Sequence, residues 1–157
     1  MILTPKTCKP SASQTKLIAQ LCADIVNMSP TWFAERTKPP NKAIADGIAR
    51  EAESKRWYSL HYDVNLTEVG FCLSDDGQIG CSPDALVGDD GLLESKNPQL
   101  ETHADYLLEG GLEDDYRCQC AFQLIVTGRK WCDLVSYCPP LEPIVVRVVP
   151  NLFTQAL

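Results

Sequence analysis

A tight turn between two short apolar runs constrains the fold of this chain more than any other feature. Residues 85–87 (Ala-Leu-Val) and 92–96 (Leu-Leu-Glu-Ser-Lys) flank the segment 88–91 (Gly-Asp-Asp-Gly). Glycine and aspartate in such a segment are typical of a β-hairpin turn. We therefore expect two antiparallel strands here, with Asp89-Asp90 at the tip.

The hairpin gathers charged side chains. Strand alternation over residues 91–96 places Glu94 and Lys96 on one face, and the turn brings Asp84 within about one residue of the position opposite them. Because neighbouring carboxylates repel each other, a hard divalent cation such as Mg²⁺ is the usual means of relieving the repulsion. This pattern favours a metal site with the Lys96 ammonium beside a metal-bound water. The alternative is that Asp84 is a turn residue and that Glu94 and Lys96 form a solvated strand face.

The rest of the chain predicts helices and strands around this hairpin. Apolar residues at helical spacing predict helices over residues 13–27, 41–60, 102–108 and 113–128. Short apolar or β-branched runs predict strands at 69–73, 79–82, 131–137 and 144–149. This order indicates an α/β class fold, with a central mixed β-sheet flanked by helices. We expect a single domain over residues 1–157, with an N-terminal helical segment (1–40) and a core (41–149).

Composition excludes several classes of protein. With 45% hydrophobic and 22% charged residues, the 157-residue chain is not expected to be disordered. No run approaches eighteen apolar residues, so we expect no membrane association. The first residues lack the basic-then-apolar pattern of a signal peptide, which favours a cytoplasmic protein.

The net charge of −7 argues, taken alone, against nucleic-acid binding, but the charges are segregated. Residues 1–57 contain nine Lys or Arg residues and five Asp or Glu residues. Residues 58–116 contain one basic and fourteen acidic residues of these types, and residues 117–157 contain four basic and two acidic ones. Lys96 is the one basic residue of the acidic middle. Its isolation among acids makes Lys96 the most informative residue of the chain.

The order of motifs resembles that of a nuclease family. Ser82-Pro83-Asp84, then Glu94-Ser95-Lys96-Asn97-Pro98, is similar to the PD-(D/E)xK nuclease motif, and more narrowly to the lambda-exonuclease/YqaJ-like viral recombination nucleases. Those read Ser-Pro-Asp-Gly, a hairpin, Glu-x-Lys-Cys-Pro, a His, a helix with spaced Gln residues, and a strand after Val-Thr-Gly. The matching residues outside the motif are Gly47, Glu51, Tyr58, His103, Gln119, Gln123 and the segment 126–139.

This resemblance implies a restriction-endonuclease-like core and a set of site residues. It implies that Asp84, Glu94, the Ser95 main-chain carbonyl and Glu51 hold Mg²⁺, with Mn²⁺ expected to substitute for it. It implies that Lys96 positions the attacking water. For binding of DNA or phosphate it implies Ser82, His103, Gln119 and Gln123, with Gln119 also serving catalysis.

Four of these residues have a plainer alternative. Glu51 could be a solvated helix charge beside Arg50 and Glu53. Gln119 and Gln123 are four residues apart, so they share a helix face, but both could be surface glutamines. His103 could contact DNA or simply begin a helix.

The sequence also departs from the family pattern. Ala85, Asn97 and Ala121 stand where relatives often have Gly, Cys and Gln. In the family a longer N-terminal region holds the DNA 5′ phosphate with an Arg and a Ser, and only fifty residues precede Glu51 here. Candidate substitutes are the basic residues Lys9, Lys16, Arg36, Lys38 and Lys42.

The numbers and positions of the cysteines and histidines limit which metal cofactors are expected. Eight cysteines without a signal peptide favour reduced thiols. Some relatives carry an iron–sulfur cluster on one upstream and three downstream cysteines, but no cysteine follows Cys138, so a cluster is not expected. Two histidines make a His-rich zinc site improbable.

The expected function is that of a Mg²⁺-dependent DNA exonuclease of phage or prophage recombination type, in the bacterial cytoplasm. It would degrade linear double-stranded DNA, 5′-to-3′, to leave single-stranded tails. The resemblance implies a single-strand annealing protein as partner and a homo-oligomeric ring, a trimer, with basic terminal segments facing the channel. The alternatives are a structure-specific endonuclease with the same core and a non-catalytic DNA-binding or assembly subunit.

Overall fold

The computed structural model of the chain describes residues 18–19, 22–23 and 42–150. The chain divides into two compact units, Met1–Pro39 and Pro40–Leu157. In the first unit, residues 18–19 and 22–23 are helical, and the other residues of the helix predicted over 13–27 lie outside the described part.

The second unit is a mixed α/β structure, as predicted. Its elements in chain order are α3 (Lys42–Tyr62), β1 (Leu66–Thr67), β2 (Cys72–Leu73), β3 (Gly80–Cys81), β4 (Ala85–Val87), β5 (Gly91–Lys96), α4 (Leu100–Glu109), α5 (Asp114–Thr127), β6 (Trp131–Ser136) and β7 (Ile144–Val148). The two-residue strand β1 was not predicted, because a run this short carries no alternation.

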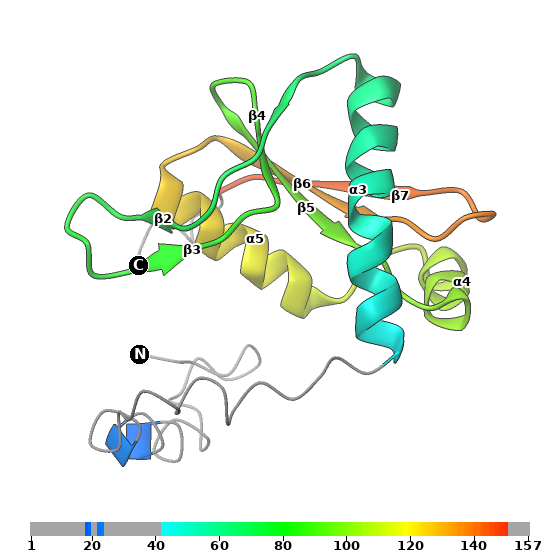
Figure 1. Cartoon of the computed structure of the whole chain (residues 1–157), viewed down its shortest axis with the longest axis horizontal. Coiled ribbons are helices and arrows are strands. Elements are labelled where there is room, and N and C mark those ends of the chain that lie inside the picture. Colours follow the sequence, from blue (N-terminus) through cyan, green and yellow to red (C-terminus); the bar gives the residue numbers. More distant parts are fainter. Residues whose placement is uncertain (1–17, 20–21, 24–41, 151–157) are drawn as a thin grey trace. The chain divides into compact units, whose positions relative to one another are not determined.

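Five strands form one mixed sheet in the order β1-β4-β5-β6-β7. Strands β5 and β6 are parallel, and every other neighbouring pair in this sheet is antiparallel. The connection between the parallel strands contains α4 and α5, because a parallel pair needs a long crossover. Strands β2 and β3 pair as a separate small sheet, which lies beside α5 in Figure 1.

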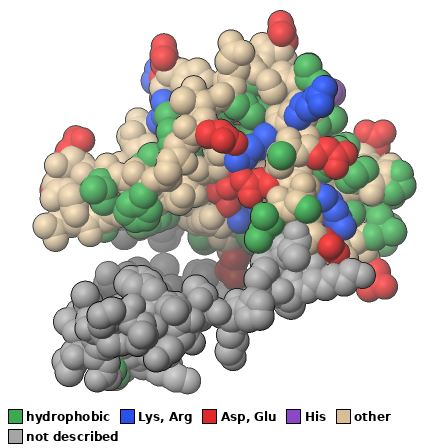
Figure 2. All heavy atoms as spheres, viewed as in Figure 1, with side chains coloured by type: hydrophobic (Ala, Val, Ile, Leu, Met, Phe, Trp, Pro, Cys, Tyr) green, Lys and Arg blue, Asp and Glu red, His purple; other side chains and the backbone are tan. Residues whose placement is uncertain are grey.

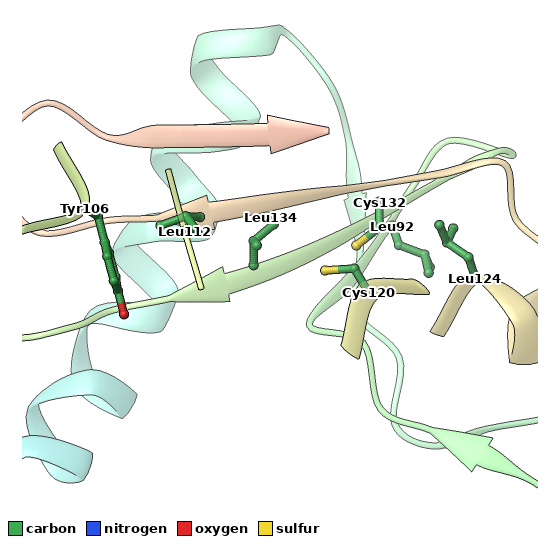
Figure 3. Packing of buried hydrophobic residues seen from close by; sticks show 7 residues of the cluster. All are labelled: Leu92, Tyr106, Leu112, Cys120, Leu124, Cys132 and Leu134. Carbon is green, nitrogen blue, oxygen red and sulfur yellow. The ribbon is translucent and has the colours of Figure 1, made fainter. Parts of the chain in front are cut away.

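The two faces of the sheet are covered by different helices. Helix α3 crosses one face, where Tyr58 packs against Leu93 and Val135. Helices α4 and α5 cover the other face, and Figure 3 shows the residues packed there: Leu92, Tyr106, Leu112, Cys120, Leu124, Cys132 and Leu134. Consecutive residues of β5 therefore pack into hydrophobic cores on opposite faces of the sheet, as strand alternation requires.

The predicted hairpin is present, with Ala85 paired to Leu93 and Val87 paired to Gly91. A side chain at position 91 would collide with the Trp131 ring, since a Cβ built there lies 2.2 Å from a ring carbon. Gly91 thus lets β6 pair with β5 while Trp131 packs over the backbone. Helix α5 ends at Gly128 in a left-handed conformation (φ 65°), from which the chain enters β6.

No helix in the described part of the chain is both long and apolar enough to cross a membrane.

Candidate functional site

The candidate site lies where β5 ends, and its first element is the hairpin register. Continued by one residue, this register sets Asp84 opposite Glu94. The main-chain N–H of Ser95 donates a hydrogen bond to Asp84 Oδ2 at 2.6 Å. In an extended strand the N–H and C=O of one residue point to the same side. The Ser95 carbonyl therefore faces the Asp84 side of β5, as its predicted role as a main-chain ligand requires.

The Asp84 carboxyl group lies in an unfavourable place for a negative charge. Burial, followed by the negative charges of Glu94 and Glu51, raises its pKa to about 6, although the hydrogen bond from Ser95 and the charge of Lys55 oppose this shift. The site thus concentrates negative charge on a partly buried carboxyl group. A bound cation would relieve that repulsion.

Glu94 is almost fully buried, and side chains from two elements hold its carboxylate. Lys96 Nζ and Gln119 Nε2 donate to Oε1 at 2.6 and 2.7 Å, and Gln123 Nε2 donates to Oε2 at 2.7 Å. Glu94 and Lys96 face α5 because they alternate with Ser95, which faces α3. Glu94 and Lys96 lie together, as strand alternation predicts, and both glutamines contact Glu94, so the alternative that both are surface residues without a contact at the site does not hold.

Lys96 lies between three groups. Its ammonium donates to Glu94 Oε1 and to Gln119 Oε1 at 2.9 Å, and it lies 5.0 Å from the centroid of the Tyr116 ring. Tyr116 and Gln119 are three residues apart on α5, so they present one helix face to the ammonium. Two of the three ammonium N–H groups are used by these oxygens, and no described residue takes the third.

Helix α3 carries Glu51, whose negative charge is close enough to act on the Asp84 carboxyl group. Lys55, four residues later, forms ion pairs with Glu51 at 2.7 Å and with Glu68 at 3.2 Å. Partial burial lowers the pKa of Lys55, but the hydrogen bonds to both carboxylates outweigh it and the net shift is upward. Glu51 is therefore near the site, as predicted, but it is paired with a lysine that the sequence analysis did not assign to the site.

Close packing of α3 on β5 depends on Ser54. Its hydroxyl forms a hydrogen bond with the Ser95 hydroxyl, and Ser54 is only 1% exposed. A small polar residue at this position allows the helix to approach the strand and satisfies the Ser95 side chain.

The donor chemistry of the site suits Mg²⁺. The described residues contain no group of three or more acidic, histidine or cysteine side chains arranged around a common metal position. Asp84, Glu94 and the Ser95 carbonyl provide two carboxylates and one carbonyl, and Mg²⁺ typically takes one or two carboxylates and keeps several waters.

Two predicted DNA contacts are not supported by their positions. His103 is fully buried, with Nδ1 2.7 Å from the Ser136 hydroxyl and Nε2 2.9 Å from the Glu142 carbonyl oxygen. Because a carbonyl only accepts, Nε2 carries the proton, and Nδ1 accepts from Ser136. Gln123 is 2% exposed and is bonded to Glu94. Tertiary packing takes both side chains into the interior, which the helical spacing alone could not reveal.

Ser82 and Gln119 have accessible positions. The exposed Ser82 hydroxyl donates to the Gly70 carbonyl at 2.8 Å, and its oxygen can still accept a hydrogen bond. Gln119 is exposed and uses one N–H on Glu94, so its second N–H can reach a ligand. The candidates for 5′-phosphate binding at positions 9, 16, 36 and 38 lie outside the described residues, as does the side chain of Lys42.

A second polar cluster, which was not predicted from the sequence, lies on the α3 side of the sheet. Asp133 is buried and accepts hydrogen bonds from the Tyr58 hydroxyl at 2.7 Å and from Arg147 at 2.7 and 2.8 Å. The Arg147 guanidinium lies 3.9 Å from the centroid of the Trp131 ring. This cluster ties α3 to β6 and β7 and so holds the helix that carries Glu51. A single charged residue, Asp133, between the apolar residues Cys132 and Leu134 was its only sequence signal.

Figure 2 shows acidic and basic side chains interleaved on one face of the described part, without a broad surface of a single sign. Long-range attraction of a polyanion by a basic patch is therefore not a property of this face.

Comparisons with known proteins identify the family of the chain and structures with a similar fold. The model of the YqaJ-like viral recombinase domain matches residues 4–130. The crystal structure of an alkaline exonuclease (LHK-Exo) from Laribacter hongkongensis is similar, with a TM-score of 0.76 and 30% identity over 94% of this chain and 75% of that chain. The structure of LHK-Exo in complex with dAMP gives a TM-score of 0.77 and 29% identity over the same shares.

A more distant structure shares the fold alone. A phage-related exonuclease from Haemophilus somnus 129PT has a TM-score of 0.71 at 10% identity, over 98% of this chain and 80% of that chain. No curated protein matches the sequence. The resemblance inferred from the motifs is confirmed by the family match and by the LHK-Exo structures.

Proposed function

Because the chain belongs to the family of YqaJ-like viral recombinase domains, we propose that it is a Mg²⁺-dependent exonuclease that hydrolyses linear double-stranded DNA. The proposed direction is 5′-to-3′, and the proposed product is a duplex with single-stranded tails. The likeness to an alkaline exonuclease that binds dAMP supports a nuclease active on DNA.

One observation carries the proposal. The hairpin register and the bond from Ser95 to Asp84 assemble two carboxylates and one lysine at the end of a central strand. Lys96 is the one basic residue between positions 58 and 116. A structural or assembly protein has no evident need for an acid cluster that raises a carboxyl pKa to about 6.

In this proposal Asp84, Glu94 and the Ser95 carbonyl hold Mg²⁺, with Glu51 approaching from α3. When bound, Mg²⁺ supplies a more acidic water and stabilises negative charge on the phosphate. The Lys55 ammonium offsets the charge of Glu51.

The remaining side chains position the reactants. Lys96 is anchored by two hydrogen bonds, and its third N–H orients the attacking water or approaches a phosphate oxygen. Gln119 and Ser82, both exposed, bind phosphate oxygens. No role in DNA contact is proposed for His103 or Gln123, because both are buried.

The proposed partners and assembly rest on the resemblance to the nuclease family. The substrate is double-stranded DNA, and a single-strand annealing protein is the proposed recipient of the tails. A homo-oligomeric ring around the duplex, a trimer, is proposed as the working assembly. The proposed location is the cytoplasm of a bacterial cell that carries the phage or prophage.

The experiment that tests this function compares DNA forms. Linear duplex and covalently closed circular duplex are incubated with the full chain in Mg²⁺, each linear substrate with or without a 5′ phosphate and labelled at its 5′ or 3′ end. The proposal predicts loss of the linear duplex only, with early release of the 5′ label. If cleavage requires the 5′ phosphate, the protein recognises the phosphorylated 5′ end of the DNA.

Other outcomes separate the alternatives. Cleavage of closed circular DNA would replace the exonuclease by an endonuclease with the same core. Binding without cleavage in either Mg²⁺ or Mn²⁺ would indicate a non-catalytic DNA-binding subunit. Loss of the 3′ label first would reverse the proposed direction.

A further inference from the structure

The buried amide of Gln123 lies behind the candidate site, and the proposed function gives it no role. Gln123 is 2% exposed and projects from the side of α5 that also carries the core residues Cys120 and Leu124. Burying an amide in an apolar core is costly unless both ends find hydrogen-bond partners. The presence of Gln123 therefore requires an explanation, which its two contacts provide.

The two ends of the Gln123 amide have opposite partners. Nε2 donates to Glu94 Oε2 at 2.7 Å, and Oε1 lies 3.9 Å from Cys132 Sγ, whose thiol donates to it. A carboxylate only accepts, so the amide N–H must face Glu94 and the amide oxygen must face the thiol. The pair of contacts therefore selects one orientation of the amide.

The same contact decides how the oxygens of Glu94 are used. Oε1 accepts two hydrogen bonds, from Lys96 and Gln119, whereas among the described residues Oε2 accepts only the one from Gln123. A carboxylate oxygen has two lone-pair positions. One position on Oε2 therefore stays available, and the hydrogen bond from Gln123 determines its direction.

We propose that Gln123 is a positioning residue, which fixes the Glu94 carboxylate so that one lone pair of Oε2 is directed to the cation. The consequence for cation binding rests on the proposed function, because that function places the cation at Glu94. Partners of this kind, which hold a ligating carboxylate from behind, typically change metal affinity by roughly 10- to 100-fold when removed. Gln123 thus contributes to the site although no DNA reaches it.

The test uses the full chain and measures cation binding directly. Mn²⁺ is titrated into wild type, Gln123→Met and Leu124→Ala by calorimetry, and thermal midpoints are recorded without metal. Methionine keeps the length of the side chain but donates no hydrogen bond. Leu124→Ala is the matched control, because Leu124 is equally buried on the same helix and belongs to the apolar core. We expect Mn²⁺ affinity to fall about 10- to 100-fold in Gln123→Met and to stay within about twofold in Leu124→Ala.

A second variant keeps the test decisive if Gln123→Met does not fold. Gln123→Asn retains a buried amide, but its side chain is one methylene shorter and cannot span the distance to Glu94, so the same loss of affinity is expected. Unchanged affinity in a folded Gln123 variant would overturn the proposal. An equal loss in Leu124→Ala would overturn it too, because the effect would then come from helix stability.

A metal-free measurement separates this proposal from the proposed function. In ¹H–¹⁵N spectra of wild type, the Gln123 side-chain amide protons should exchange slowly with solvent and should shift in Glu94→Gln. Mn²⁺ binding without DNA cleavage would contradict the nuclease and leave the positioning role standing. If the Gln123 amide protons exchange rapidly with solvent and their chemical shifts do not change in Glu94→Gln, the positioning role is contradicted, whether or not the protein cleaves DNA.

Discussion

The main-chain amide of Ser95 donates to Asp84 Oδ2 across the β4–β5 hairpin at 2.6 Å, one residue beyond the last paired position of β4. This bond replaces the next strand pairing with a side-chain contact, so Asp84 takes the place that a backbone carbonyl would occupy. Its carboxyl group is thereby held beside Glu94 despite the repulsion between them. Because the two carboxylates are held close together, this arrangement lowers the stability of the metal-free fold.

Asp84→Asn should stabilise the metal-free protein. The variant keeps an oxygen for the Ser95 N–H but removes a charge that burial and the nearby carboxylates disfavour. We expect the thermal midpoint in EDTA to rise by on the order of 2–4 °C and DNA cleavage to disappear. The control is Asp89→Asn at the exposed hairpin tip, which should leave both unchanged. A marked fall in the midpoint of Asp84→Asn with cleavage retained would show that Asp84 is structural.

Lys55→Met should strengthen cation binding and weaken the metal-free fold. Without its ammonium, Glu51 and Glu68 lose their ion pairs and the site becomes more negative. We expect about 1 kcal/mol less stability in urea titrations and on the order of tenfold tighter Mn²⁺ binding. Lys130→Met, which removes the exposed pair with Asp90 on the hairpin tip, is the control and should change neither. Weaker Mn²⁺ binding in Lys55→Met would mean that Lys55 positions Glu51 instead of balancing its charge.

Lys96→Arg and Lys96→Met should both lower the rate of cleavage by on the order of 10² or more. The compact ammonium fits between Glu94 Oε1 and Gln119 Oε1, and a broad planar guanidinium cannot keep both contacts and the free N–H. DNA binding, measured by fluorescence anisotropy in Ca²⁺, should survive in both variants. Near-normal turnover of Lys96→Arg would reduce Lys96 to a counter-charge.

Arg147→Met should destabilise the fold by about 3 kcal/mol, because it leaves the Asp133 carboxylate buried with only the Tyr58 hydroxyl as partner. Urea unfolding measures the loss. Adding Asp133→Asn to Arg147→Met should recover part of it, since the uncompensated charge is then gone. A loss below about 1 kcal/mol would show that solvent reaches Asp133 once the guanidinium is removed.

The hairpin and the pairing of Asp84 with Glu94 could be predicted because they depend on local rules. The Gly-Asp-Asp-Gly segment specifies a turn, and strand alternation then determines which side chains share a face. Only a mixed sheet was predicted, and the parallel pairing of β6 with β5 is compatible with the long helical connection between them. For the hairpin, the sequence alone is therefore enough to predict which side chains lie together.

The burial of His103 and Gln123 could not be predicted in the same way. Helical spacing places a residue on a face, but only packing decides whether that face meets solvent, a core or a carboxylate. Lys55 was overlooked for a related reason: its spacing from Glu51 was visible, whereas its approach to Asp84 depends on where α3 crosses the sheet. The role of Asp133 within an apolar strand could not be predicted, because its partner Arg147 is fourteen residues away and their contact depends on the pairing of β6 with β7.

The central claim, that the acid pair and Lys96 form a Mg²⁺-dependent active site, is tested most directly by release of nucleotides. Uniformly labelled linear duplex is incubated with wild type, Glu94→Gln or Asp89→Asn, in Mg²⁺ or in EDTA, and acid-soluble label is measured over time. We predict steady release by wild type and Asp89→Asn in Mg²⁺, and none in EDTA or by Glu94→Gln. Release by Glu94→Gln at the wild-type rate, or undiminished release in EDTA, would contradict the account.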